Sequence, residues 1–126
     1  MSQEKRPAVY TTSISGIPDE VWDAFRKQVD DWRAEIDKSY TLRKALEEAI
    51  DLFGGKIRAY PQNITWRSTT RAKPVPIQIN NESRDALHII VSETGYKINV
   101  VMLNAMDLYI SSFEDRKNTH RRKRYF

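Results

Sequence analysis

Residues 45–53 read Ala-Leu-Glu-Glu-Ala-Ile-Asp-Leu-Phe, and residues 101–109 repeat the same pattern as Val-Met-Leu-Asn-Ala-Met-Asp-Leu-Tyr. The shared pattern is apolar-apolar-x-x-Ala-apolar-Asp-Leu-aromatic, at an offset of 56 residues. Apolar residues in both segments recur at helical spacing. Each segment therefore predicts an amphipathic helix with one side facing a core.

A second match lies upstream of the first. Residues 17–25 (Ile-Pro-Asp-Glu-Val-Trp-Asp-Ala-Phe) align with residues 79–87 (Ile-Asn-Asn-Glu-Ser-Arg-Asp-Ala-Leu) at an offset of 62. The two offsets differ by six residues, which predicts that the first helix of the first half is longer by close to two turns. Two unrelated amphipathic helices could resemble each other by chance, but agreement over both segments favours an internal duplication.

Start and stop signals outline four helices. Pro18 and the acids after it favour a helix that runs to Ile36. Thr41 is a suitable N-cap for a second helix, and the pair Gly54-Gly55 predicts its end. In the second half, we expect one helix from Asn80 or Asn81 to about Thr94 and another over residues 97–113.

A segment of alternating polarity precedes each helix pair. In residues 75–80 every second residue is Val or Ile, which is the pattern of a half-buried strand. Residues 10–15 alternate more faintly. A lone strand leaves its backbone polar groups unpaired, so we expect the two segments to pair antiparallel above four helices. The predicted fold is mainly α with a two-stranded antiparallel β-ribbon.

The predicted organisation has five parts. They are a flexible N-terminal arm (1–9), a first strand–helix–helix unit (10–54), a basic linker (55–73), a second unit (74–114) and a basic, irregular tail (115–126). A linker of this length can join the two units, because the entropy cost of loop closure grows slowly with length.

This arrangement resembles the ribbon–helix–helix superfamily of the Arc, MetJ and CopG repressors. The residues that carry the resemblance are Ile14 to Phe25 with Thr41 to Phe53, and Val75 to Leu87 with Lys97 to Tyr109. Two units in one chain are similar to the tandem type found in TraY of conjugative plasmids and in the second virulence-C protein of T-DNA transfer. The resemblance implies an intramolecular pseudo-dimer that inserts its ribbon into the major groove of DNA.

The charge distribution is compatible with a polyanionic partner. Residues 19–53 contain ten acids and six bases, whereas residues 54–76 contain five bases and residues 116–126 contain six bases, both without an acid. Cations gathered in loops and chain ends suit a nucleic acid. A solvated linker and tail would have the same composition, so charge alone leaves both interpretations open.

The free face of the ribbon is the predicted base-reading surface. Short polar side chains can hydrogen-bond base edges in the major groove, and Gln can make a bidentate contact to adenine. The predicted base-reading residues are Thr11, Ser13, Ser15 and Gln78. A merely solvated strand face would also be polar, which is the alternative.

The predicted phosphate-binding residues fall into two groups. The resemblance implies that the second helix of each unit points its N-terminus at a phosphate, through Thr41, Arg43 and Lys44 in the first unit and Lys97 and Asn99 in the second. Bases of the linker and tail would add non-specific contacts. These bases are Lys73, Arg121, Arg122, Lys123 and Arg124.

Several function classes are disfavoured by the sequence. It contains no glycine-rich phosphate loop, no metal-ligand spacing, no nucleophile–base set and no cysteine, so we expect neither an enzyme nor a cofactor. It shows no export signal and no membrane-length apolar run, which suits the cytoplasm.

The expected function is that of a plasmid or mobile-element DNA-binding protein. It would be either a relaxosome accessory that works with a relaxase or a transcriptional repressor, with a non-palindromic double-stranded site because the halves differ. An antitoxin-type autorepressor and a helical protein-interaction module without DNA function are the alternatives. We expect one chain to form the pseudo-dimer, and several copies could bind one DNA.

Overall fold

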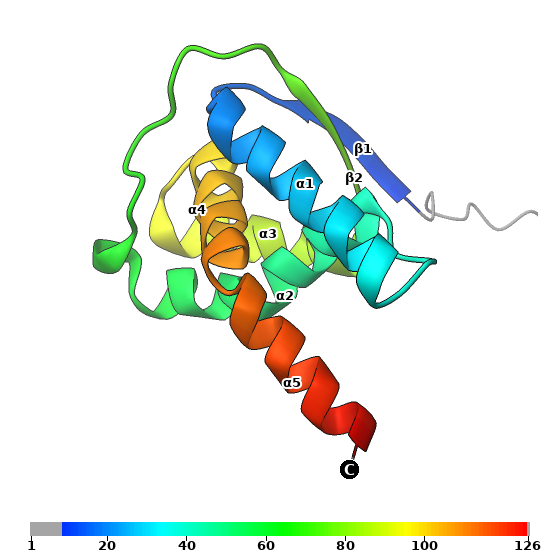
Figure 1. Ribbon diagram of the computed structural model, residues 1–126. Helices are drawn as coiled ribbons and strands as arrows, with labels where there is room; N and C mark the ends of the chain where they lie inside the picture. Colours follow the sequence, from blue (N-terminus) through cyan, green and yellow to red (C-terminus); the bar gives the residue numbers. More distant parts are fainter. Residues whose placement is uncertain (1–8, 126) are drawn as a thin grey trace, which may run out of the picture.

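A computed structural model gives the fold of the chain and describes residues 9–125, with side chains up to residue 121. Within these residues, two strands and five helices are joined by short turns and one longer connection (Figure 1). In chain order they are β1 (Val9–Ile14), α1 (Asp19–Glu35), α2 (Leu42–Ala59), the 3₁₀ turn η1 (Pro61–Asn63), β2 (Val75–Asn80), α3 (Asn81–Thr94), α4 (Ile98–Ser111) and α5 (Phe113–Tyr125). The order strand–helix–helix thus occurs twice, as predicted.

The two strands pair antiparallel, which confirms the predicted ribbon. Thr11 pairs with Gln78 and Ser13 with Pro76. The ribbon lies along one side of the helices (Figure 1). Its inner face is apolar because alternate residues of β2 are Val or Ile, and Ile77 is only 2% exposed. One face of each strand is therefore fixed on the core, and the other face is left to solvent.

The core is shared by both halves of the chain. Helix α2 packs against α3 and α4, and α1 packs against α4. Phe25 of the first half and Tyr109 of the second are fully buried, with ring centroids 4.8 Å apart. Burying one such side chain stabilises a fold by about 1.5–3 kcal/mol. Neither half encloses these side chains alone, so the two halves stabilise each other.

The predicted end of α2 at Gly54-Gly55 is wrong. The helix continues to Ala59 and buries Ile57, which is 2% exposed. It ends before Pro61, a residue that cannot continue a helix. Gly54 instead allows a close helix approach, since a Cβ at this position would lie 2.8 Å from Cδ1 of Ile90. The glycine pair thus reflects packing between α2 and α3.

This contact predicts that Gly54→Val destabilises the protein more than Gly55→Val. A Cβ at residue 55 meets no atom within 4 Å, so the second variant has the same helix propensity without the clash. Overpacking at residue 54 is expected to cost about 1–3 kcal/mol beyond the Gly55→Val value. Urea unfolding monitored by circular dichroism measures the difference. Equal stability of the two variants would contradict the close approach.

The six-residue difference between the halves is divided between helix and turn. We expected all of it in the first helix, but α1 has 17 residues and α3 has 14. The other three residues lie in the turn, which spans residues 36–41 in the first half and 95–97 in the second. Gly95 closes α3 abruptly because it adopts φ 77°, a left-handed conformation that glycine tolerates. The first half uses a longer turn, in which Asp37 accepts a hydrogen bond from the Ser39 amide.

The expected irregular tail is a helix. Helix α5 packs by one side on the end of α1, where Trp32 contacts Phe113 and His120. Lys117 Nζ lies 2.9 Å from a Glu35 carboxylate oxygen. The sequence beyond Phe113 has no apolar period, so periodicity could not predict this helix. In Figure 1, α5 projects from the helices on the side away from the ribbon. Among the described residues, no helix is long and apolar enough to cross a membrane.

Candidate nucleic-acid interface

The outer face of the ribbon carries polar side chains in a fixed register. Thr11, Ser13 and Gln78 are exposed, as is Pro76. Directly opposed residues of an antiparallel pair hold their Cβ atoms about 4.5–5.5 Å apart. The two hydroxyls and the amide therefore form one compact set of hydrogen-bond donors and acceptors on a rigid backbone. Three of the four predicted base-reading residues are brought together here.

Ser15, the fourth predicted base-reading residue, lies just beyond the strand. It is exposed, but β1 ends at Ile14 and four residues separate the strand from α1. By contrast, β2 runs directly into α3. Gly16 makes the first of these two junctions with φ 86°, a conformation that other residues rarely adopt. Ser15 therefore occupies the corner where the chain leaves the ribbon.

The N-terminus of α4 lies beside this corner. Lys97 occupies the N-cap position without a side-chain capping bond and is exposed. The amide Nδ2 of Asn99 donates to the Ser15 carbonyl at 3.2 Å, and Asn99 Oδ1 accepts from the Val100 amide. Ser13 and Ser15 line an open hollow together with these two residues of α4. Both predicted phosphate-binding residues of the second unit are thus adjacent to the ribbon.

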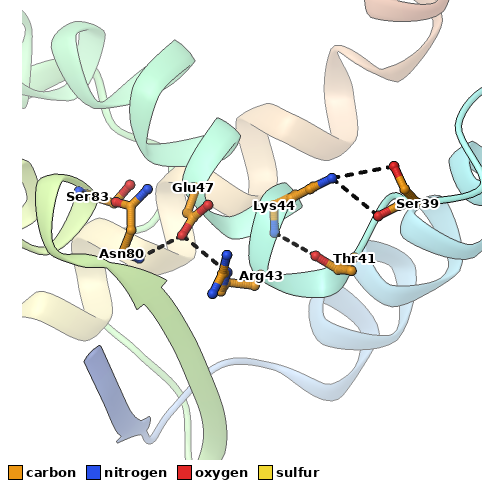
Figure 2. A network of polar contacts seen from close by, with 7 residues as sticks. All are labelled: Ser39, Thr41, Arg43, Lys44, Glu47, Asn80 and Ser83. Atoms are coloured by element: carbon orange, nitrogen blue, oxygen red, sulfur yellow. Dashed lines mark hydrogen bonds and ion pairs between the residues drawn. The ribbon is translucent and has the colours of Figure 1, made fainter. Parts of the chain in front are cut away.

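The N-terminus of α2 lies beside the other end of the ribbon (Figure 2). Thr41 caps the helix as predicted, because its hydroxyl accepts from the Lys44 amide at 3.2 Å. The ammonium group of Lys44 turns back to Ser39, at 3.4 Å from its carbonyl. Arg43 Nε lies 3.6 Å from a Glu47 carboxylate oxygen. The predicted residues are therefore present, but both cations have protein partners.

Glu47 is the residue of this region that sequence analysis missed. Its carboxylate accepts a hydrogen bond from the Asn80 amide at 2.6 Å, which joins α2 to the junction of β2 and α3 (Figure 2). Asn80 in turn caps α3 by accepting from the Ser83 amide at 2.7 Å. In the sequence, Glu47 appears only as an ordinary i,i+4 partner of Arg43. Its position places a negative charge beside one end of the ribbon.

The linker between the halves is attached to the helical core. We call residues 64–74 the strap. Asn104 of α4, 2% exposed, accepts from the Trp66 amide at 2.9 Å and donates to the Trp66 carbonyl at 2.7 Å. A further bond from Asn104 to the Val100 carbonyl, at 2.8 Å, fixes its side chain. Trp66 is partly buried and packs against the core.

The remaining predicted phosphate-binding residues are divided between two places. Lys73 is exposed on the strap, next to the ribbon. Arg121 lies on α5, away from the ribbon (Figure 1). The backbone of residues 122–124 continues α5, but the side chains of Arg122, Lys123 and Arg124 lie outside the part that the structure describes. Arg121 is thus not brought together with the ribbon.

A series of hydrogen bonds links side chains inside the helical part of the protein. The Tyr40 hydroxyl donates to Glu48, so the Tyr109 hydroxyl, 2.7 Å away, must donate to Tyr40. Burial and the hydrogen bond to Glu48 raise the pKa of Tyr40 far above its usual range. Burial also raises the pKa of Tyr109, against the opposing effects of Tyr40 and Arg116. Both phenols are therefore held in their neutral form.

Comparison of the chain with protein-family models, with curated proteins and with solved structures gave no significant match. Among the residues that the structure describes, no group of three or more His, Asp or Glu could hold a metal ion.

Proposed function

We propose that this chain is a single-chain ribbon–helix–helix pseudo-dimer that binds double-stranded DNA by inserting its ribbon into the major groove. One observation carries the proposal: the ribbon presents Thr11, Ser13 and Gln78 to solvent on a backbone fixed by a buried opposite face. The protein would act in the cytoplasm, without a cofactor and without catalysis.

The dimensions of the ribbon suit the groove. Six residues per strand extend for about 20 Å, and the two strands lie about 4.8 Å apart. The major groove of B-DNA is about 12 Å wide and admits a two-stranded ribbon. Short hydroxyl side chains allow the backbone to approach the bases closely, and Gln78 supplies the longer group that can discriminate adenine.

The flanks of the ribbon suit the DNA backbone. Helix N-termini present amide groups and a positive dipole end, which favour phosphate. The N-termini of α2 and α4 lie near opposite ends of the ribbon, and Lys97 and Asn99 accompany the second of them. Phosphates on both sides of an occupied groove could then be contacted.

The two halves would read different half-sites. Pro76 faces solvent opposite Ser13 and its side chain offers no hydrogen-bonding group, so β2 would make fewer base contacts than β1. We therefore propose a non-palindromic site and a role as a relaxosome accessory, with a relaxase as partner, or as a repressor.

The proposed function predicts that the triple variant T11A/S13A/Q78A loses sequence discrimination. A preferred duplex is first selected from random-sequence DNA with the wild-type protein. Fluorescence anisotropy then compares this duplex with a scrambled one. We expect the variant to bind the preferred duplex about tenfold or more weakly, because each lost specific contact costs about 1–3 kcal/mol, and to bind scrambled DNA as before.

The matched control is Q62A/T65A/S92A, which removes the same three side-chain types from exposed positions outside the ribbon. It should bind like the wild type. Unchanged discrimination in the ribbon variant would refute the assignment of the reading face. Absence of any duplex affinity in the wild type would refute the function and favour a protein-interaction module.

A further inference from the structure

The two ends of the ribbon differ in their surroundings. At one end, β1 leaves the ribbon at Ile14 and β2 enters it at Val75, since these two residues are paired. The strap reaches this end. At the other end, Val9 is paired with Asn80, next to Glu47. The strap thus lies beside one end of the ribbon and not beside the other.

The strap is held firmly where it passes the ribbon. The Thr70 amide donates to the Gly16 carbonyl at 3.0 Å, and the Thr70 hydroxyl approaches the same oxygen at 3.3 Å. A Cβ at Gly16 would lie 2.5 Å from Cβ of Thr69. Only a glycine permits this contact, so strap and corner form one packed unit.

The strap presents two cations beside this corner. Arg71 and Lys73 are exposed, and within the described part of the chain neither has an ion-pair partner. They line an open hollow with Ser15, and Asp19 is the acidic residue of the same hollow. Ser15 also lines the neighbouring hollow that contains Lys97. Three cations therefore surround the corner where β1 ends.

Within the described residues, the opposite end carries less available positive charge. Among the described residues at this end, Arg43 interacts with Glu47, Lys44 interacts with Ser39, and the Arg84 guanidinium lies over the Tyr10 ring. A groove beside Asn80 is lined by several acids. These acids are Asp37, Glu47, Glu48, Asp51 and Glu82. A polyanion seated on the ribbon would meet attraction at one end and acids at the other.

We propose that residues 69–73 of the strap bind the DNA backbone beyond the β1 exit, so that the protein sits on its DNA in one orientation. The inference rests on the proposed function and adds a phosphate-binding element with a direction. Arg71 can bind phosphate in a bidentate manner, and Lys73 acts as a point charge. The bond between Thr70 and Gly16 sets both cations at a constant position relative to Ser13 and Ser15.

The first test removes the two charges with R71Q/K73Q. The probe is a scrambled duplex of about 30 base pairs, titrated between about 50 and 200 mM salt. Loss of two phosphate contacts should lower the slope of log K against log salt by about 1.8 and weaken binding about tenfold or more near 100 mM. Thermal melting checks that the variant is folded, which we expect because both side chains are exposed.

The matched control is K56Q/R58Q, which removes one lysine and one arginine from exposed positions in the last turn of α2, outside the ribbon. It should keep the wild-type slope. An unchanged slope in R71Q/K73Q, or an equal loss in the control, would overturn the strap assignment even if T11A/S13A/Q78A abolishes discrimination. If the wild type binds no duplex, the proposed function and the strap assignment fall together.

The second test measures orientation. The chain has no cysteine, so Ala72→Cys provides a single attachment point for a DNA-cleaving chelate on the strap. On the preferred duplex, we expect cleavage on one flank of the site. Equal cleavage on both flanks would show that the protein binds in two orientations and would refute the proposed direction.

Discussion

Asn104→Ala is expected to lower the free energy of unfolding by about 2–4 kcal/mol. The substitution leaves the part-buried amide and carbonyl of Trp66 without their side-chain partner, and an unsatisfied polar group costs up to about 1–3 kcal/mol when it is buried. It also opens a cavity at a position that is 2% exposed. The strap then loses its attachment to α4. Lys73 is therefore held less firmly in its position beside the ribbon.

Two measurements check this prediction. Urea denaturation gives the stability, with Asn118→Ala on the exposed side of α5 as the control. Duplex titration at low temperature, where the variant remains folded, measures the effect on binding. We expect weaker binding and a shallower salt dependence than in the wild type. Wild-type stability in the Asn104 variant would mean that the strap is not held by this side chain.

The buried tyrosine pair is expected to make the protein unfold at alkaline pH. The free tyrosine pKa is 10.0, and the folded protein raises the pKa of Tyr40 and of Tyr109. Below about pH 10 both states are protonated, and the stabilisation is complete. Above about pH 10, the two tyrosines ionise only in the unfolded state. The free energy of unfolding therefore falls by about 1.4 kcal/mol per pH unit for each tyrosine.

The double variant Y40F/Y109F tests the cause of this loss. It should be less stable near neutral pH, because Glu48 loses a donor, but its stability should fall more slowly between about pH 10 and 12. Tyr60→Phe is the control, since Tyr60 is 55% exposed and lies in neither hydrogen bond. Chemical denaturation at a series of pH values gives the slopes. Parallel slopes in the wild type and the double variant would rule out the tyrosines as the origin of alkaline unfolding.

Local patterns were sufficient to predict most of the fold. The alternation in residues 75–80 predicts β2 and its buried face, because the strand has a period of two residues. Pairing with the weaker alternation of residues 10–15 followed from the need of a lone strand for a partner. Thr41 was predicted as a cap from its residue type, and Asn80 was one of two candidates for the start of α3; both side chains accept a capping amide bond.

The errors come from contacts between segments that are distant in sequence. Gly54 has the residue type of a helix end, and only its approach to Ile90 explains why the helix continues. Helix α5 is held by Trp32, which lies about 80 residues earlier, so no local period announces it. The interface was predicted as a set of residue types, but the position of Glu47 between Asn80 and Arg43 depends on the tertiary fold.

The two paired strands belong to one polypeptide, and this connection affects how the protein assembles and diversifies. Folding needs no encounter between separate molecules, so the melting temperature should not vary with protein concentration. A substitution in a homodimer is present in both subunits, whereas a substitution here is present once. The N-caps of α2 and α4 occupy equivalent positions in the two halves, and they already differ in residue type, as Thr41 and Lys97. Each half can therefore change its surface residues without the same change in the other half.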